Sequence, residues 1–449
     1  MHDECVSVHQ NVMIYFGIGT VTPGPTETLQ TYFRSRPPRR NQFVGIRLWR
    51  TTTTPTMVFS YYWQPWKAVY ISFGAILLLI RIPYWVLRNL LPAFRPRRSW
   101  SLARSVILEI LNATTAILLE IGLPEEEHLE SIALASDRNG FVWVEPRSDL
   151  VMGEIQQFAE ANGVHSERIG GFWYGSKDSG SRVGHKARPG DKVVLFLHGG
   201  GFVAGSGAPS SALTATICNG LLEHVPMISR LFALEYRLAA GPPFKIQNPF
   251  PAALIDAIAG YRYLLDLEFD PRNIIIAGDS AGAILAYQLV RYTTTHEHSL
   301  LQCPGAALML SPCGDTSFRK DPETSMTTNR RSDYLRSWID AGYPAIALAG
   351  RLSASEVGNS WLSPGILENG NDMEGVFAGF PPSFILVGEA EMCRDSMRVF
   401  RDRMLLDIGK DQVTYVEVKD APHDFLGFNF LEPERSIALR KIATWVDTL

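Results

Sequence analysis

Cysteine is scarce in this sequence, and its spacing gives no sign of a metal site. The five residues are Cys5, Cys218, Cys303, Cys313 and Cys393, and none of them forms the C-x-x-C spacing of zinc or redox sites. An odd and scattered set also excludes a disulfide framework, although one pair, such as Cys303 with Cys313, stays open. For Cys393 we expect an ordinary buried thiol. The sequence therefore predicts neither a metal site nor a bound cofactor.

The sequence also lacks a strong excess of charge of either sign. Its formal net charge is -4, from 42 Lys and Arg against 46 Asp and Glu. A general nucleic-acid surface needs a clear basic excess, so no nucleic-acid partner is expected. The 46% hydrophobic content excludes overall disorder and supports a sizeable core. A small molecule is therefore the expected partner, and the oligomeric state stays open.

Long hydrophobic runs are rare, and one stands out by its position. Residues 1 to about 60 show little periodicity and include a basic cluster from Arg34 to Arg40, so we predict a poorly ordered arm. An apolar stretch then extends from Ala68 to Ile80 and, after Arg81, from Ile82 to Leu87. Its uninterrupted part is shorter than the roughly 20 residues that cross a bilayer. The aromatic residues that flank it are typical of a membrane interface.

We predict that residues 61–98 form a membrane-associated segment. A single transmembrane anchor is the leading interpretation, and an interfacial helix and a buried cap helix are the alternatives. Basic residues occur on both sides of the segment, so the positive-inside rule gives no orientation. Asn112-Ala113-Thr114 is a glycosylation sequon, usable only if the C-terminal part is lumenal or extracellular. We expect localisation at a membrane, with the endoplasmic reticulum as the candidate compartment.

Residues 99–449 have the pattern of an α/β catalytic domain with cap elements. From Ser101 to Ile121 apolar positions repeat as in an amphipathic helix, which we expect to cover a substrate pocket. After about residue 190, short apolar runs alternate with helical patterns, which predicts βαβ units around a mostly parallel sheet. The segments are Val193 to Leu197, Leu231 to Leu234, Ala252 to Leu265, Ile274 to Ala277, Ala281 to Val290, Ala306 to Leu310, Phe384 to Val387 and Val413 to Val418.

A Gly-x-Ser-x-Gly pentapeptide, Gly278 to Gly282, lies between a strand-like and a helix-like segment. In a nucleophile elbow the serine occupies a tight strand-to-helix turn, and its hydroxyl projects from the edge of the sheet. The flanking glycines relieve the crowding that a Cβ atom would cause. A serine in this position can also merely cap a helix. Ser280 is the candidate nucleophile, and a second motif favours that interpretation.

The second motif is a run of three glycines, Gly199, Gly200 and Gly201, directly after the predicted buried strand. Consecutive glycines are costly to order. They are useful where backbone N–H groups must approach a ligand closely, as in an oxyanion hole. The two motifs together indicate an acyl-transfer site.

Four motifs resemble the hormone-sensitive-lipase-like branch of the α/β-hydrolase family, in the family's order. They are His198-Gly199-Gly200-Gly201, Tyr236-Arg237-Leu238-Ala239, Phe250-Pro251-Ala252-Ala253 and Gly278-Asp279-Ser280-Ala281-Gly282. The resemblance covers roughly residues 140 to 449 and implies the α/β-hydrolase fold with a helical cap. It also implies that the N–H groups of Gly200, Gly201 and Ala281 form the oxyanion hole. The stretch that ends at Trp100 resembles fungal membrane-anchored steryl acetyl hydrolase-like proteins as well.

The family order of nucleophile, acid and histidine places the catalytic histidine after Ser280. Three histidines qualify by order. His296 and His298 fall in a polar stretch that predicts a solvated loop. His423 follows a predicted strand, where the family has its catalytic histidine on a loop, and the resemblance implies this role for it.

The catalytic acid is expected in the loop after the predicted strand that ends at Val387. The family's aspartate aligns with Glu391, and glutamate also fills this role in α/β-hydrolases. Asp395 and Glu389 stay as alternatives, because the longer glutamate side chain must still reach the imidazole. The resemblance thus implies Ser280, Glu391 and His423 as the catalytic residues.

These assignments predict a serine carboxylesterase that hydrolyses an apolar ester, such as an acetylated sterol or a secondary metabolite, through an acyl-enzyme. A non-catalytic small-molecule receptor on the same fold and an acyltransferase are the alternatives. Ala240, Ala283 and Ile284 depart from the family's pattern. None of the three replaces a catalytic group, and details of the pocket are not carried over from the family.

Overall fold

The computed structural model describes residues 58–449, except 125–126, 176–183, 297–299, 316–322, 354–355, 357 and 368–372. The chain divides into two units, Met1–Thr54 and Pro55–Leu449, and the second unit is the one described below. The predicted N-terminal arm, residues 1–60, lies outside the described residues except at its last positions.

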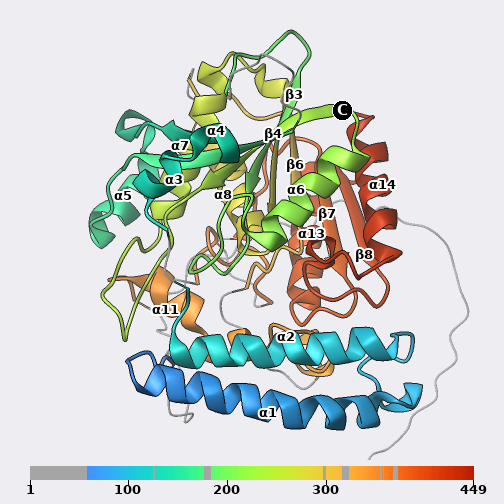
Figure 1. Ribbon diagram of the computed structural model, residues 1–449. Helices are drawn as coiled ribbons and strands as arrows, with labels where there is room; N and C mark the ends of the chain where they lie inside the picture. The colour runs from blue at the N-terminus through green and yellow to red at the C-terminus, as the bar shows by residue number, and fades with distance from the viewer. Residues whose placement is uncertain are drawn as a thin grey trace, which may run out of the picture. The chain divides into compact units, whose positions relative to one another are not determined.

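A mostly parallel sheet of eight strands forms the centre of the second unit (Figure 1). Its order is β1-β2-β4-β3-β5-β6-β7-β8. β2 pairs antiparallel with both β1 and β4, and the pairs from β4 to β8 are parallel. The strands are β1 (Phe141–Val144), β2 (Ile169–Gly175), β3 (Lys192–Leu197), β4 (Ile228–Glu235), β5 (Ile274–Asp279), β6 (Ala306–Leu310), β7 (Ser383–Gly388) and β8 (Val413–Val418).

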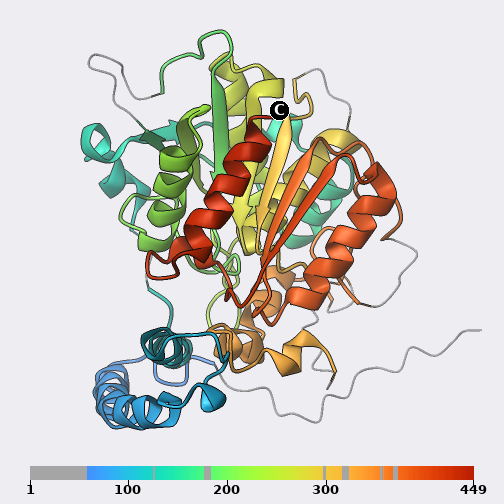
Figure 2. The ribbon, with the colours of Figure 1, turned by 90° about the vertical axis from the view of Figure 1, so that its right-hand side faces the viewer.

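Helices cover both faces of this sheet (Figures 1 and 2). The longer ones after the N-terminal region are α5 (Gly153–Asn162), α6 (Ala212–His224), α7 (Ala252–Asp266), α8 (Ala281–Thr295), α13 (Arg394–Ile408) and α14 (Glu434–Val446). The shorter ones are α3 (Leu129–Ala133), α4 (Ser136–Asn139), α9 (Ser325–Thr328), α10 (Arg336–Ala341), α11 (Tyr343–Ala349) and the 3-10 turns η1 (Pro92–Phe94), η2 (Ser148–Leu150), η3 (Pro271–Asn273) and η5 (Phe425–Gly427).

Alternate residues of β3 point into two separate cores. Val193 and Leu195 belong to the core that the residues of α7, α8 and α13 complete. Val194 and Phe196 belong to the core formed with α6 and α14. Because both faces of the strand are buried, its sequence is a continuous apolar run rather than an alternating one. The predicted α/β-hydrolase fold is confirmed.

The sequence pattern does not predict the antiparallel strands β1 and β2. β2 contains Gly170 and Gly171, which weaken the pattern of a strand. The structure explains both glycines, because a Cβ atom would lie 2.1 Å from the Phe141 ring at Gly170 and 2.2 Å from the Phe232 ring at Gly171. The aromatic rings of the neighbouring strands therefore take the space of the missing side chains.

Two long helices, α1 (Trp66–Asn89) and α2 (Leu102–Ile121), pack against each other at the N-terminal end of the described unit (Figures 1 and 2). Gly74 lets them approach closely, since a Cβ atom there would lie 2.8 Å from Ile117. Trp85 is buried between them. By length and composition both helices can cross a membrane, but 39% of the apolar window of α2 is buried in the protein, against 11% for α1. The amphipathic helix predicted from Ser101 is α2.

The expectation of an ordinary buried thiol at Cys393 is wrong, and the pair left open for Cys303 with Cys313 does not form. Cys313 is paired in a disulfide with Cys393, and Cys303 is free. The partners are 80 residues apart in the sequence but follow neighbouring strands, β6 and β7, so their loops meet at the same edge of the sheet. Sequence spacing carries no information about this pairing.

The glycosylation sequon lies within α2 rather than in a surface loop. Asn112 is 6% exposed, on the face of α2 that packs against α10. Attachment of an N-linked sugar requires an exposed asparagine side chain. The sequon therefore gives no orientation for the hydrolase body.

Candidate active site

Ser280 lies in the tight turn between β5 and α8. Its backbone has φ 53° and ψ −116°, a conformation that residues other than glycine rarely adopt. Gly282 makes the turn possible, since a Cβ atom there would lie 2.0 Å from the Leu197 carbonyl oxygen. The Ser280 N–H donates to the Leu310 carbonyl at 2.8 Å, which ties the turn to β6. This is the geometry of a nucleophile elbow.

The glycine loop after β3 is joined directly to this elbow. The Gly199 N–H donates to Asp279 Oδ1 at 2.9 Å, and Asp279 is fully buried. Gly200 has φ 113°, and a Cβ atom there would lie 2.0 Å from the Ala204 carbonyl oxygen. Only glycine fits this position without moving the loop.

The three predicted oxyanion-hole residues lie around the space next to the elbow. Gly200, Gly201 and Ala281 line the same cavity as Ser280. Within the described part of the chain their backbone N–H groups donate to no protein acceptor. Ala281 also begins α8, whose N-terminus carries a partial positive charge. The arrangement fits an anionic oxygen, as the oxyanion-hole prediction requires.

The structure brings the three predicted catalytic residues together in one chain of hydrogen bonds. His423 lies in the loop after β8 and is almost fully buried. Its Nε2 is 2.9 Å from Ser280 Oγ, and its Nδ1 is 2.7 Å from Glu391 Oε2. Ser280 is 143 residues from His423 in the sequence and Glu391 is 32, so the fold alone creates this contact.

Glu391 is held in place by its second carboxylate oxygen. Oε1 accepts a hydrogen bond from Ser311 Oγ at 2.8 Å and another from the Gly388 N–H. Ser311 follows β6 and Gly388 ends β7, so two strand ends fix the carboxylate. The longer glutamate side chain does reach the imidazole.

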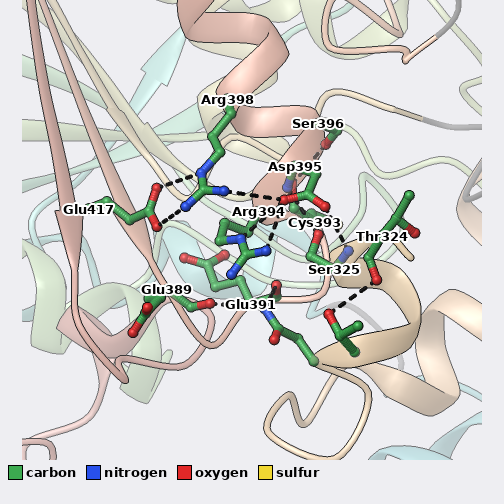
Figure 3. A network of polar contacts seen from close by, with 12 residues as sticks. Thr324, Ser325, Glu389, Glu391, Cys393, Arg394, Asp395, Ser396, Arg398 and Glu417 are labelled. Carbon is green, nitrogen blue, oxygen red and sulfur yellow. Dashed lines mark hydrogen bonds and ion pairs between the residues drawn. The ribbon is translucent and has the colours of Figure 1, made fainter. Parts of the chain in front are cut away.

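The two alternative acids have other partners. Figure 3 shows Asp395 turned toward Arg394 and Arg398, with its second oxygen accepting from the Ser325 N–H at 2.7 Å. Glu389 accepts from the Asp420 N–H at 3.0 Å. Neither carboxylate forms a hydrogen bond with His423 in the described structure.

Other histidines are placed away from this chain of hydrogen bonds. His296 caps the end of α8, and its ring lies 4.8 Å from that of Tyr292. His298 lies outside the described residues. Only His423, among the three histidines after Ser280 considered from the sequence, is seen beside the elbow.

Sequence reasoning missed Asp424, a further acidic side chain at the site. It is buried, its Oδ2 lies 3.1 Å from His423 Nε2, and its Oδ1 has no hydrogen-bond partner among the residues that the structure describes. A left-handed backbone at Asp424, with φ 46°, turns its side chain toward the cavity. The only signal in the sequence is its position next to His423.

Burial and neighbouring charge act in opposite directions on His423. Burial lowers the pKa of His423, but the carboxylates of Asp424 and then Glu391 outweigh it, and the pKa lies well above its ordinary value. Burial raises the pKa of Glu391, which the charge of His423 partly offsets. Burial, followed by the repulsion of Asp424, also holds the pKa of Asp279 well above its usual range. The site thus favours a positive charge on the imidazole.

The cavity beside Ser280 is small and mostly apolar. Its volume is about 260 Å³, and Leu118 of α2 contributes to its wall together with Leu213, Trp338 and Ile339. The predicted role of α2 in covering a pocket agrees with this placement. A wider cavity of about 720 Å³ elsewhere contains none of the predicted site residues.

The Cys313–Cys393 disulfide lies next to the same site. Cys313 lines the cavity, and Cys393 is two residues after Glu391. The bond therefore joins a wall of the cavity to the loop that carries the carboxylate. Among the described residues, no group of His, Cys, Asp and Glu is arranged to hold a metal ion.

A comparison with known families accounts for this architecture. The sequence profile of the α/β hydrolase fold family matches residues 194–427, just over half of the chain. The chain belongs to the α/β-hydrolase fold family. The match begins within β3, before the glycine loop, and ends after His423, so it spans every predicted site residue of this α/β hydrolase.

Relatives of this α/β hydrolase include named ester hydrolases. It is 29% identical over 265 residues to an acetyl-hydrolase of Streptomyces hygroscopicus, covering 58% of this chain and 77% of the relative. It is 27% identical over 259 residues to an esterase of Acinetobacter venetianus, covering 58% and 75%. An esterase structure from the bacterial hormone-sensitive lipase family shares the fold, with a TM-score of 0.52, 23% identity and coverage of 78% and 99%.

The expected α/β-hydrolase family and the predicted enzyme class, a carboxylic ester hydrolase, are confirmed. The likeness to the solved structure from the hormone-sensitive lipase family is one of fold. The narrower resemblance to fungal steryl acetyl hydrolase-like proteins stays a prediction.

Proposed function

We propose that this carboxylic ester hydrolase is a serine esterase in which Ser280, His423 and Glu391 form the catalytic triad. The observation that carries the proposal is the continuous chain from Ser280 Oγ through His423 to Glu391, with distances of 2.9 Å and 2.7 Å. Ser280 lines a cavity together with three residues whose N–H groups have no acceptor among the described residues, Gly200, Gly201 and Ala281. A nucleophile, a base, an orienting acid and an oxyanion site are the parts that acyl transfer needs.

The first half of the reaction forms an acyl-enzyme. His423 Nε2 takes the Ser280 proton while Oγ attacks the ester carbonyl, and Glu391 stabilises the imidazolium through Nδ1. The negative oxygen of the tetrahedral intermediate accepts hydrogen bonds from the N–H groups of Gly200, Gly201 and Ala281. Collapse breaks the ester bond, and the leaving alcohol takes its proton from Nε2.

Water completes the reaction by the same route. His423 Nε2 removes a proton from the water as its oxygen attacks the acyl carbon. The second tetrahedral intermediate breaks the bond to Ser280 Oγ, which regains a proton from the imidazolium. This second step releases the free acid and regenerates Ser280, so the two steps as written consume no cofactor.

The substrate that we propose is an apolar ester with a short acyl group, such as an acetylated sterol or secondary metabolite. The cavity volume of about 260 Å³ lies just below the range of about 300–1,000 Å³ that is common for ligand sites. This size suits a short acyl group inside, with the apolar alcohol extending along Leu118 and Trp338. The similarity to an acetyl-hydrolase supports the same acyl length.

Hydrolysis of p-nitrophenyl acetate, butyrate and octanoate by the full chain in mild detergent tests the proposal. Ser280→Ala is expected to lower kcat by about 10⁴- to 10⁶-fold, because the nucleophile is lost. Ser436→Ala, on α14 and away from the site, is the matched control and should keep the parent's rate. The acetate ester is expected to be the best substrate.

Three other results would contradict the proposal in different ways. Equal activity of Ser280→Ala and the parent would remove Ser280 from the mechanism. Saturable binding of an ester by folded protein without turnover would indicate the receptor alternative. A new ester as the main product after addition of an alcohol would indicate an acyltransferase.

A further inference from the structure

The outer face of α1 exposes large apolar side chains. We call it the docking face, and it consists of Val69, Phe73, Ile76, Leu79, Ile80 and Leu87. Leu79 is 72% exposed and Leu87 is 68% exposed, whereas the opposite side of α1 packs on α2. A continuous apolar surface of this kind marks a site of contact with a partner or a membrane.

The N-terminal end of α1 is attached to the hydrolase body. Phe59 is buried, and its ring lies 4.9 Å from that of Phe244 and 4.7 Å from that of Tyr343. Its N–H donates to the Leu119 carbonyl at 2.6 Å. The chain therefore enters α1 directly from a packed position on α11 and α2.

The C-terminal end of α1 leads back to the same body. Trp100 is buried, and its Nε1 donates to the Asp420 carbonyl oxygen at 2.8 Å. Ser99 Oγ donates to Asp420 Oδ2 at 2.6 Å, and Arg97 donates to Asn329 Oδ1 at 2.6 Å. Asp420 belongs to the loop that also carries His423, so this attachment ends next to the candidate site.

These two attachments determine how α1 can meet a membrane. A 24-residue helix is about 36 Å long at about 1.5 Å per residue, enough to cross a hydrocarbon core of about 30 Å. A helix that crosses the membrane has its ends on opposite sides. Both ends of α1 contact one folded body on one side, so crossing would require the contacts of Phe59 or of Trp100 to break.

The charge around the docking face identifies its partner as an anionic surface. Residues 55–108 contain no Asp or Glu, although the whole chain has a net charge of -4. The segment has seven basic residues, and three of them, Arg88, Arg97 and Arg104, form ion pairs with Glu109, Asp420 and Glu434. For the other four, Lys67, Arg81, Arg95 and Arg98, no ion pair is seen among the described residues. Trp63 and Trp66 are exposed at one end of the helix and Tyr84 near the other. Interfacial helices combine an apolar face, flanking cations and aromatic rings in this way.

We propose that the docking face lies flat in the surface of an anionic lipid bilayer, with the hydrolase body and both ends of α1 on one side of the membrane. This replaces the single transmembrane anchor with the interfacial alternative. α2 packs on the inner side of α1, and its Thr115 and Leu118 line the cavity of Ser280. The helix pair therefore lies between the docking face and the cavity of Ser280.

Binding of the full chain to sedimented lipid vesicles tests the docking face. The double variant Leu79→Glu/Leu87→Glu is expected to bind phosphatidylcholine–phosphatidylserine vesicles at least about tenfold more weakly than the parent, because two charges enter the apolar face. The matched control is Leu134→Glu/Leu406→Glu, at positions 90% and 85% exposed elsewhere on the protein. It carries the same charge change and should bind like the parent. Vesicles of phosphatidylcholine alone should bind the parent more weakly.

The docking does not depend on the proposed chemistry, and one assay separates the two. Hydrolysis of soluble p-nitrophenyl acetate by Leu79→Glu/Leu87→Glu should match the parent, because the docking face contacts no group of the site. Equal vesicle binding by this variant and its control would overturn the docking proposal and leave the esterase untouched. Loss of a self-associated state in this variant, without any vesicle binding by the parent, would assign the face to a second copy of the chain and overturn it too.

Protease protection in microsomes tests the flat orientation. Tags at the two termini of the full chain should be digested together or protected together, because the chain does not cross the membrane. A maleimide reagent that cannot cross membranes should reach Arg98→Cys from the same side. Tags on opposite sides would show a single crossing. A label at position 98 on the side away from the C-terminal tag would show that α1 and α2 both cross. Either result would overturn the proposal.

Discussion

The candidate site and the docking face differ in the burial and polarity of their side chains. At the site, Glu391 and His423 are fully buried, and each has hydrogen-bond partners from separate strand ends. On the docking face, Leu79 and Leu87 are exposed and apolar and contact little of the protein. Buried charges require fixed partners, which orders the site before any substrate arrives. Exposed apolar side chains gain free energy only when another apolar phase covers them. The site is therefore ordered by contacts within the folded chain, whereas we propose that a lipid surface covers the docking face.

Among these variants, Glu391→Gln is expected to give the largest difference between its effect on catalysis and its effect on membrane binding. The change keeps the shape but removes the charge that orients His423 and stabilises its imidazolium. We expect kcat for p-nitrophenyl acetate to fall by about 10³- to 10⁴-fold, as for loss of the acid in other triads. Vesicle binding should be unchanged. Asp395→Asn, whose carboxylate pairs with arginines, is the control, and an equal loss of kcat in that variant would reject Glu391 as the triad acid.

Removal of the disulfide at the edge of the site tests how far the folded structure of the site depends on this covalent bond. Cys313→Ala/Cys393→Ala is expected to lower the free energy of unfolding by about 2–4 kcal/mol, since the bond closes a long loop of the unfolded chain. Denaturant unfolding of the hydrolase, followed with and without reductant, measures this. Cys303→Ala removes a free cysteine and serves as control. A parent whose stability does not change with reductant would show that the bond is not present in solution.

The smallest effect is expected from Asp424→Asn, and it appears in the pH profile. His423 must be neutral to act as a base, so activity falls as it gains a proton at low pH. Asp424 raises the pKa of His423, and its removal should therefore move the acid limb of kcat/KM to lower pH. The carboxylates of Glu391, Asp333 and Asp279 also interact electrostatically with His423 and remain in the variant.

Asp411→Asn, at an exposed position, controls for a general change of charge in that experiment. An acid limb that does not move, or moves to higher pH, would show that Asp424 does not act on the imidazole. A loss of kcat at all pH values would indicate that Asp424 positions substrate instead.

Local patterns were sufficient to predict the parallel part of the sheet and the two backbone loops of the site. A buried strand such as β3 needs apolar residues on both faces, and an elbow such as that at Ser280 needs small neighbours, so each leaves a short signature in the sequence. The antiparallel strand β2 has no such signature in its sequence, because its glycines make room for aromatic rings from other strands.

The tertiary structure decided everything that depends on distant segments meeting. It placed Glu391 rather than Asp395 beside His423, paired Cys313 with Cys393, and turned Asp424 toward the imidazole. The sequence by itself determined that residues 61–98 are apolar and basic, whereas the tertiary structure determined that both ends of this segment contact the hydrolase body. The physical reason is the same in each case: residue type sets which environment a side chain prefers, and only the packed chain determines which neighbours supply it.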